Sequence, residues 1–436
     1  MSKRFICMVC TAAFMFGGKT VSKARAEEKR DNEARLKFVL VLTRHGVRSP
    51  TWSNSRLDEY AKDPWPKWGV EPGELTVHGR LLMTQFGTYY RALFAEHALV
   101  SATGCGDVNK VYLDADSNGR TLDTARGIAD GMFPGCTAEI HSLKKGTQDV
   151  LFHSSGKLGK PDPQLGLLAV SGRMGEDAAA LLPAYQGTLE AMHSVLSGCP
   201  SVDCPLGNKK SLLATPASLG PGSGDHLAEL AGPLSTAATF AENLQLEYLE
   251  GMPDEQVGWG RVNEDKMRAL MALHAANSDL IQRTPYIARV QASNLLYHME
   301  LTLQQAEEGR NIPGALGSAE QKAVFLVGHD TNISNVATLL DAHWLVKGYQ
   351  RDDAAPGGAL VFELWQRPGR EDAVRVYYLV QSPSQMRNSI PLSLAEPPKK
   401  ARIFLPGCGL SEEGVPCNWK EFQRLVSSAV DSEFVQ

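Results

Sequence analysis

The chain has 436 residues, of which 43% are hydrophobic and 21% charged, the composition of an ordinary globular protein. This length exceeds what one core usually holds, so two domains or one domain with a large insertion are expected. The formal charge is −5 at pH 7, which argues against a nucleic-acid partner because a polyanion meets general repulsion. Any anionic ligand must therefore be held by a local basic pocket.

The first 26 residues have the pattern of a signal peptide. Lys3 and Arg4 precede an apolar stretch at residues 5–16, and Ala24-Arg25-Ala26 places small residues at the two positions that a signal peptidase reads. We predict cleavage after Ala26, which leaves 39 basic and 49 acidic residues and a formal charge of −10. No stretch is long and apolar enough to span a bilayer, so the sequence predicts an exported protein, periplasmic or secreted, without a membrane anchor.

Cysteine usage agrees with export. Two of the eight cysteines lie in the predicted signal peptide, and the remaining six are an even number, which favours disulfides in an exported chain. Two pairs close short polar loops that contain Gly or Pro, and the other two cysteines are left to form a third pair. We predict the pairs Cys199 with Cys204, Cys408 with Cys417, and Cys105 with Cys136. Zinc is the alternative, but no second Cys-x-x-Cys or His cluster lies nearby.

The first predicted strand covers residues 38–42, a short uncharged run rich in β-branched residues. Such a run is typical of a strand buried on both faces, as in a parallel sheet covered by helices. Arg44, His45 and Arg48 follow it directly, before Pro50. Ligands of open α/β sheets bind outside the carboxyl ends of the strands, so these residues lie where an active site is expected. The alternative is that the two arginines are solvated loop charges.

The segments that follow alternate in type. After a polar loop at 51–74, the order strand, helix, strand, helix points to an α/β layer with parallel neighbours. The middle of the chain shows helical periodicity and no convincing strand, and the last third again contains strands. We predict helices at 75–99, 121–132, 174–197, 233–250, 264–306 and 332–341, and further strands at 111–116, 323–328, 358–366 and 374–382.

This order predicts an α/β fold in two parts. Residues 27–144 and 291–436 are expected to form an α/β catalytic domain, with a mainly parallel central sheet flanked by helices. Residues 145–290 are expected to form a smaller helical insertion that caps it.

Three of the predicted strands end in polar side chains. If these strands share a sheet and a direction, their polar residues converge on one pocket. Arginine meets phosphate oxygens with a planar fork of donors and stays charged at any relevant pH, so three of them suit a doubly charged tetrahedral anion. The residues are Arg44, His45 and Arg48 after the first strand, Asp116 and Arg120 after the second, and His329 and Asp330 after the third.

His45 and Asp330 are the candidates for the chemistry. Like charges disfavour an imidazolium, so His45, between two arginines, is expected to be neutral and nucleophilic. Asp330 can protonate a leaving alkoxide, which implies an acidic pH optimum because the acid must hold its proton in the bound complex. The alternative for Asp330 is a structural role as the cap of the helix that follows.

The motifs RHGVRSP at 44–50, DSNGRT at 116–121 and GHDTN at 328–332 resemble those of the histidine acid phosphatase family, in particular its bacterial branch of phytases and glucose-1-phosphatases. The likeness extends to GMP and GWGR within 251–261, QRTP at 282–285 and APGG at 355–358. It implies a phosphoglycerate mutase-like α/β domain with a smaller helical domain, a phosphohistidine intermediate, three disulfides, and no metal or other cofactor.

The resemblance assigns roles position by position. His45 matches the nucleophile and Asp330 the proton donor. The phosphate-binding positions are Arg44, Arg48, Arg120 and His329, and positions lining the substrate pocket are Thr51, Asp116 and Thr331. We expect a monomeric acid phosphatase that hydrolyses small phosphomonoesters, such as phytate or sugar phosphates.

Two positions depart from the phytase pattern. Trp52 and Glu71 stand where phytases carry lysine. Phytate carries many phosphates and is favoured by an outer ring of cations, so these changes weaken the case for phytate. The resemblance therefore defines the reaction better than the substrate.

Two other classes of protein were weighed. A phosphoglycerate mutase-like phosphatase shares the Arg-His-Gly start, but it is cytosolic and uses a Glu acid, so the HDTN segment and the cysteines argue against it. The second is an exported, catalytically inactive phosphate or sugar-phosphate binding protein. It would be favoured if His45 or Asp330 were replaced, and both are present.

Overall fold

The structure, a computed structural model, describes residues 34–436 except 155, 176, 200–206, 225 and 409–416. The predicted signal peptide lies outside the described residues. Within them, no helix has the length and apolar character needed to cross a membrane.

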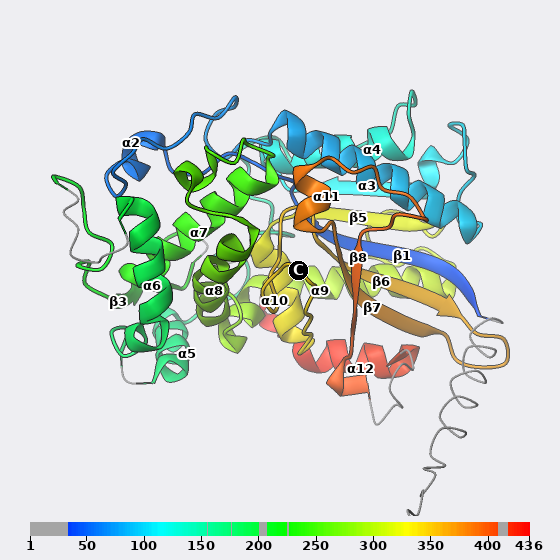
Figure 1. The fold of residues 1–436 in the computed structure, drawn as a ribbon. Coiled ribbons are helices and arrows are strands. Elements are labelled where there is room, and N and C mark those ends of the chain that lie inside the picture. Colours follow the sequence, from blue (N-terminus) through cyan, green and yellow to red (C-terminus); the bar gives the residue numbers. More distant parts are fainter. Residues whose placement is uncertain (1–33, 155, 176, 200–206, 225, 409–416) are drawn as a thin grey trace, which may run out of the picture.

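A seven-stranded sheet runs through one half of the molecule (Figure 1). Its order is β2-β5-β1-β6-β7-β8, and β9 also pairs with β7. The strands are β1 (Arg35–Arg44), β2 (Val111–Ala115), β5 (Ala323–Gly328), β6 (Ala359–Gln366), β7 (Ala373–Val380), β8 (Lys399–Ile403) and β9 (Cys417–Asn418). The α/β fold class is confirmed. The parallel pairs join β2, β5 and β1, whereas β6, β7, β8 and β9 pair antiparallel. The parallel arrangement thus covers the part of the sheet whose strands end in the predicted polar clusters.

Helices cover both faces of this sheet. In Figure 1, α3 and α4 lie over one face, and α9, α10 and α12 lie on the other. The helices are α2 (Asn54–Leu57), α3 (Val77–Glu96), α4 (Gly119–Met132), α5 (Pro163–Met174), α6 (Leu182–Ser197), α7 (Pro233–Leu249), α8 (Glu264–Ile281), α9 (Pro285–Glu308), α10 (Asp330–Leu339), α11 (Pro383–Arg387) and α12 (Trp419–Ala429).

Strand β1 is buried on both faces, as predicted. Val39 and Val41 point into a core shared with α3 and α4, whereas Leu40 and Leu42 point into a larger core shared with α9 and α10. This alternation follows from the two-residue period of a strand. The larger core continues into the helical region formed by α5 to α8, which lies to the left in Figure 1. The boundaries of the two predicted domains stay a prediction.

Two expectations for the middle of the chain are corrected. The predicted helix at 264–306 is two helices, α8 and α9, because Pro285 has no backbone N–H and occupies the first position of a new helix. The expectation of no strand is wrong, since β3 (Ser218–Pro221) and β4 (Ala228–Ala231) form a two-stranded sheet. Each has only four residues, and β3 contains Gly and Pro, so neither shows a strand pattern in the sequence.

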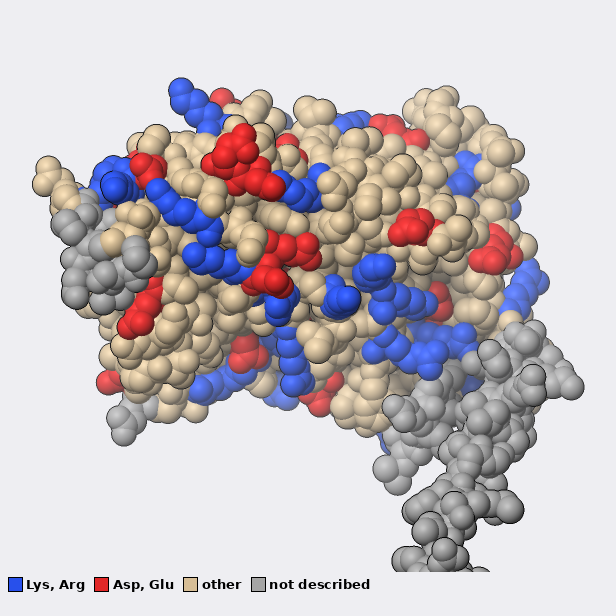
Figure 2. Space-filling view, in the orientation of Figure 1, with Lys and Arg blue, Asp and Glu red and all other residues tan. Residues whose placement is uncertain are grey.

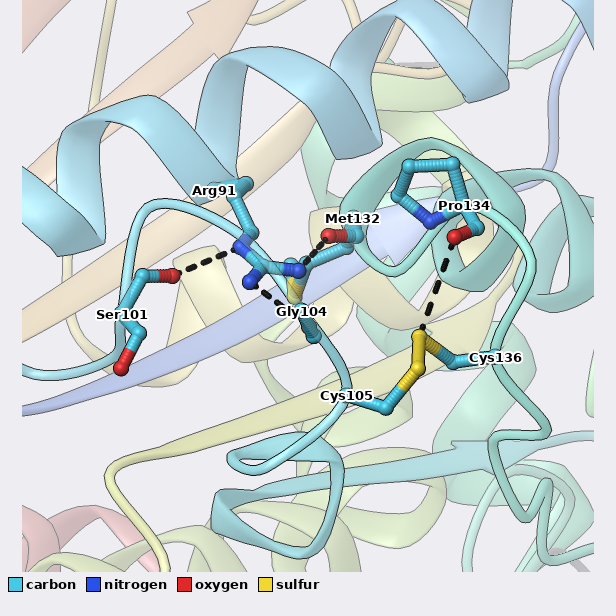
Figure 3. Close-up of a disulfide and its surroundings, with 7 residues drawn as sticks. All are labelled: Arg91, Ser101, Gly104, Cys105, Met132, Pro134 and Cys136. Atoms are coloured by element: carbon cyan, nitrogen blue, oxygen red, sulfur yellow. Dashed lines mark hydrogen bonds between the residues drawn. A yellow bond between two sulfur atoms is a disulfide. The ribbon is translucent and has the colours of Figure 1, made fainter.

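Two of the predicted disulfides are confirmed, Cys105 with Cys136 and Cys408 with Cys417. Cys199 is disulfide-bonded, and Cys204 lies outside the described residues. Figure 3 shows Cys105 and Cys136 joining the segments that follow α3 and α4. Arg91 of α3 reinforces this link, because its guanidinium donates to the carbonyls of Ser101, Met132 and Gly104 at 2.8, 2.6 and 2.9 Å.

Close packing of α3 against α4 depends on glycine at their contact. A Cβ at Gly131 would lie 1.8 Å from the Thr84 carbonyl oxygen, and a Cβ at Gly87 would lie 2.1 Å from that of Ile128. These are backbone atoms, so the two helices would have to move apart.

We predict that Gly131→Ala lowers the free energy of unfolding by about 1–3 kcal/mol, the usual cost of overpacking. Urea denaturation of the mature protein measures this. The matched control is Gly187→Ala in α6, where an added Cβ meets nothing within 4 Å; helix propensity alone should make this variant about 1 kcal/mol more stable. Equal effects of the two changes would contradict the packing argument.

Candidate active site

The register of the three parallel strands aligns their carboxyl ends. Arg44 of β1 pairs with Gly328 of β5, and the next residue, His45, donates its backbone N–H to the Gly328 carbonyl at 3.0 Å. On the other side, Asp116 donates its backbone N–H to the Val327 carbonyl at 3.1 Å. As the sequence predicted, the three strands share a sheet and a direction.

A cavity of about 200 Å³ lies at these strand ends. Five predicted site residues line it, His45, Arg120, His329, Asp330 and Thr331. Thr51 is exposed and lies outside this lining set. Asn332, the last residue of the GHDTN motif, also lines it, whereas no motif in the sequence indicates the remaining lining residues, Phe152, His153, Ser154, His226, Gln291 and Asn335.

His45 is held as a neutral imidazole. Its Nδ1 lies 2.9 Å from the carbonyl oxygen of Gly46, which can only accept, so Nδ1 carries the proton and Nε2 keeps its lone pair. Burial and the charges of Arg120, Arg44 and Arg48 hold the pKa of His45 well below its usual value. The ring is therefore suited to act as a nucleophile through Nε2.

Arg44 and Arg48 lie beside this imidazole and share one carboxylate. Arg48 donates to an oxygen of Glu242 at 2.9 Å, and Arg44 pairs with the other oxygen and also donates to the Ala354 carbonyl at 2.8 Å. Burial alone would raise the pKa of Glu242, but the charges of Arg48 and Arg44 outweigh it and lower that pKa. Glu242 belongs to α7, and nothing in its local sequence distinguishes it from other helix carboxylates.

The arginines keep unused donors. The Nε atoms of Arg44, Arg48 and Arg120 are all buried, and none of them has a hydrogen-bond partner. Buried N–H groups without a partner are rare in folded proteins, and three of them on cations that surround His45 indicate a binding place for an anion.

Asp116 and His329 form a second hydrogen-bonded group. Asp116 is fully buried, and one of its oxygens accepts from Nε2 of His329 at 2.7 Å and from Nε2 of His153 at 3.2 Å. Nδ1 of His329 lies 3.3 Å from a guanidinium nitrogen of Arg120, which donates to it. Asp116 therefore orients His329, and His329 in turn orients Arg120 at the cavity wall.

In the described part of the chain, Asp116, His153 and His329 are the one group of side chains that could hold a metal ion. The ligand atoms of Asp116, His153 and His329 lie within 4.8 Å of one another. Their arrangement is accounted for by hydrogen bonds, since both imidazoles donate to the same carboxylate oxygen. The positive charge of Arg120 beside His329 also opposes a cation there.

Asp330 is the first residue of α10, and His329 occupies the N-cap position in its place. Burial and the charge of Glu242 would raise the pKa of its carboxyl group, but nearby basic groups, Arg44 first among them, outweigh these effects and lower that pKa. The helix dipole acts in the same direction. An anion bound among the arginines would offset their charge and raise this pKa, so Asp330 can gain a proton when such a ligand binds.

The two positions that depart from the phytase pattern lie outside the cavity lining. Trp52 packs edge-on against Phe240 of α7 at 6.1 Å, and the guanidinium of Arg56 stacks on its other side at 3.4 Å. Glu71 is exposed, and its carbonyl accepts a hydrogen bond from Ser49 at 2.6 Å.

Fold and site together place a neutral histidine beside a cluster of arginines at the carboxyl ends of parallel strands. Comparison with known proteins agrees. Residues 35–166 and 272–379 match the model of the histidine phosphatase superfamily, branch 2. The phytase AppA of Escherichia coli is 31% identical over 91% of this chain and 92% of its own. The glucose-1-phosphatase of Providencia rettgeri is 29% identical over 98% of this chain and 99% of its own.

A solved structure shows the same fold. The phytase of Hafnia alvei in complex with tartrate superposes with a TM-score of 0.84 at 32% identity, and the match covers 93% of this chain and 99% of that one. The chain therefore belongs to the histidine phosphatase superfamily, branch 2, and is a phosphatase of the histidine acid phosphatase kind.

We predict that Glu242→Ala lowers the free energy of unfolding by about 3–5 kcal/mol, because it leaves two buried guanidinium groups without their carboxylate. Thermal unfolding at pH 6 checks this. The control is Glu59→Ala, which removes an exposed ion pair with Lys210 and should leave the melting temperature unchanged. Similar melting temperatures for both variants would contradict the assigned role of Glu242.

Proposed function

We propose that the protein is an exported acid phosphatase that releases orthophosphate from phosphomonoesters through a phosphohistidine at His45. The observation that carries the proposal is the neutral His45, which lines the cavity beside the buried Arg44 and Arg48 and the half-buried Arg120, three arginines whose Nε donors lack partners. A phosphoryl group supplies acceptors for such donors, and the arginines stabilise the charge on its oxygens during transfer.

In the first step, Nε2 of His45 attacks phosphorus, a P–N bond forms and the P–O bond to the leaving group breaks. The leaving oxygen takes a proton from Asp330, which lines the same cavity. The products are an alcohol, a phosphohistidine and an Asp330 carboxylate. Binding of the phosphate dianion prepares this step, because it offsets Arg44 and so favours the protonated acid.

In the second step, water attacks phosphorus and gives its proton to Asp330. The P–N bond breaks, orthophosphate is released, and both His45 and protonated Asp330 are restored. The hydrogen bond from Nδ1 of His45 to Gly46 keeps the same ring orientation in both steps.

The walls beyond the reacting phosphoryl group favour a polar leaving group. His153, His226, Gln291 and Asn335 line this part of the cavity, and Arg120 is the single Lys or Arg among the described lining residues. Imidazoles and amides suit the hydroxyl groups of a sugar or inositol. We therefore propose polyol phosphates as substrates, with sugar phosphates and phytate as the two forms to compare.

Export is supported by the disulfides, which persist in oxidising compartments. On the face shown in Figure 2, Lys and Arg are mixed with Asp and Glu over much of the surface and gather in one group at the right.

The proposal predicts that the protein releases orthophosphate in EDTA at about pH 5 from an aryl phosphate, glucose 1-phosphate and phytate. With each of the three substrates, His45→Ala should lower kcat at least about a thousandfold. Malachite-green detection of orthophosphate measures both. Circular dichroism and thermal unfolding of His45→Ala should match the unmodified protein. Substantial turnover by a folded His45→Ala would overturn the nucleophile, and no release by the unmodified protein would favour a binding protein.

We further predict that Asp330→Asn loses about 10²- to 10⁴-fold in kcat on alkyl phosphates, whose alkoxides need a proton, and much less on aryl phosphates. Leaving groups of graded pKa give the measurement. Asp341→Asn, at an exposed aspartate just beyond α10, is the matched control and should behave like the unmodified protein. An equal loss on both ester types would exclude Asp330 as the proton donor.

A further inference from the structure

A second cavity, of about 460 Å³, also reaches Asp330. Its lining comes from α8, from the segment between His343 and Ala354, and from Tyr185 and Arg283. Among the described residues, Asp330 alone belongs to the linings of both cavities. Asp330 thus separates the substrate pocket from a second space that the proposed reaction does not use.

His274 of α8 and Asp353 line this second cavity together with Asp330. Asp353 is 5% exposed, and neither of its carboxylate oxygens makes a hydrogen bond. Burial raises the pKa of Asp353, and nearby His274, Arg44 and Gln245 offset only part of that effect. Asp353 therefore takes up a proton more readily than an ordinary carboxyl group, and in its protonated form it does not cancel a positive charge on His274.

Several titratable groups face Asp330 or His274. Those that face Asp330 are Arg44 of β1, Arg120 of α4, Glu242 of α7, His274 of α8, the adjacent His329 and Tyr378 of β7. The second cavity also places Tyr185, Asp279, Arg283, His343, Arg351, Asp352 and Asp353 beside His274. His274 in turn acts on three carboxyl groups, those of Glu242, Asp330 and Asp353.

Among the basic side chains that face Asp330, His274 is the least constrained by hydrogen bonds. Arg44 is always charged and is bound to Glu242 and to the Ala354 carbonyl. His329 is fixed between Asp116 and Arg120. His274 has no hydrogen bond to any of the described residues and borders an open space.

We propose that His274 acts on Asp330 across the second cavity and sets the upper pH limit of proton donation. The inference rests on the proposed function, in which Asp330 protonates the leaving oxygen. A positive charge on His274 disfavours a proton on Asp330, so it makes Asp330 a stronger acid and a better donor. In the substrate complex, the same charge makes Asp330 lose its proton at a lower pH. The enzyme therefore becomes inactive at a lower pH on the alkaline side of its profile.

The test compares two replacements of His274 that differ in charge. His274→Gln removes the cation. The alkaline limb of the pH profile of kcat on an alkyl phosphate should therefore move to higher pH by about half a pH unit or more. His274→Lys keeps a cation, so its limb should stay at or below that of the unmodified protein. With an aryl phosphate, whose leaving group needs no proton, neither variant should move the limb.

The matched control is His343→Gln, which removes the other imidazole of this cavity, one that is exposed and pairs with Asp352 at 2.6 Å. It should leave the profile unchanged. The inference is overturned by an unmoved limb in His274→Gln, by the same upward shift in His274→Lys, or by an equal shift with the aryl ester. If Asp330→Asn still loses more activity on alkyl than on aryl phosphates, only the inference about His274 has failed. If Asp330→Asn loses activity equally on both ester types, the proposed role of Asp330 has failed.

Discussion

The structure depends on the burial of positive charge at the end of a central strand. Arg44 and Arg48 lie almost fully inside the protein, where an uncompensated charge would be very costly. Glu242 supplies the compensation, because its two oxygens engage the two guanidinium groups. One carboxylate does not balance two arginines, and their Nε donors have no partners. In the proposed reaction these donors and the charge of the arginines bind the phosphoryl group.

The same positive field acts on both groups of the proposed chemistry. It lowers the pKa of His45, which keeps the nucleophile neutral, and it lowers the pKa of Asp330, which keeps the acid ionised until an anion binds. A bound phosphate dianion reduces the field at both places. Nucleophile and acid are thus linked through the charge of the ligand, although they come from different strand ends.

Much of this site could be predicted from the sequence, because a buried strand is a short apolar run and the polar residues at its end follow it directly. This pattern marks the ends of β1, β2 and β5, and with them Arg44, His45 and Asp330. Glu242, His153 and His274 could not be predicted, since each lies in a helix or loop whose sequence does not reveal which neighbour it faces. Strand direction has no local signal either, so β6 and β7 were predicted as strands without their antiparallel pairing.

The position of β1 in the sheet has a consequence for the order of folding. The strand that precedes His45 pairs on one side with residues 323–328 and on the other with residues 359–366, so its neighbours follow it by about 280 to 330 residues. Contacts so distant in sequence close late, because the loop entropy must be overcome first. The nucleophile therefore belongs to a centre that can assemble only when almost the whole chain is present. If a chain folds only after it has been exported, β5 and β6 are both already present when β1 begins to pair.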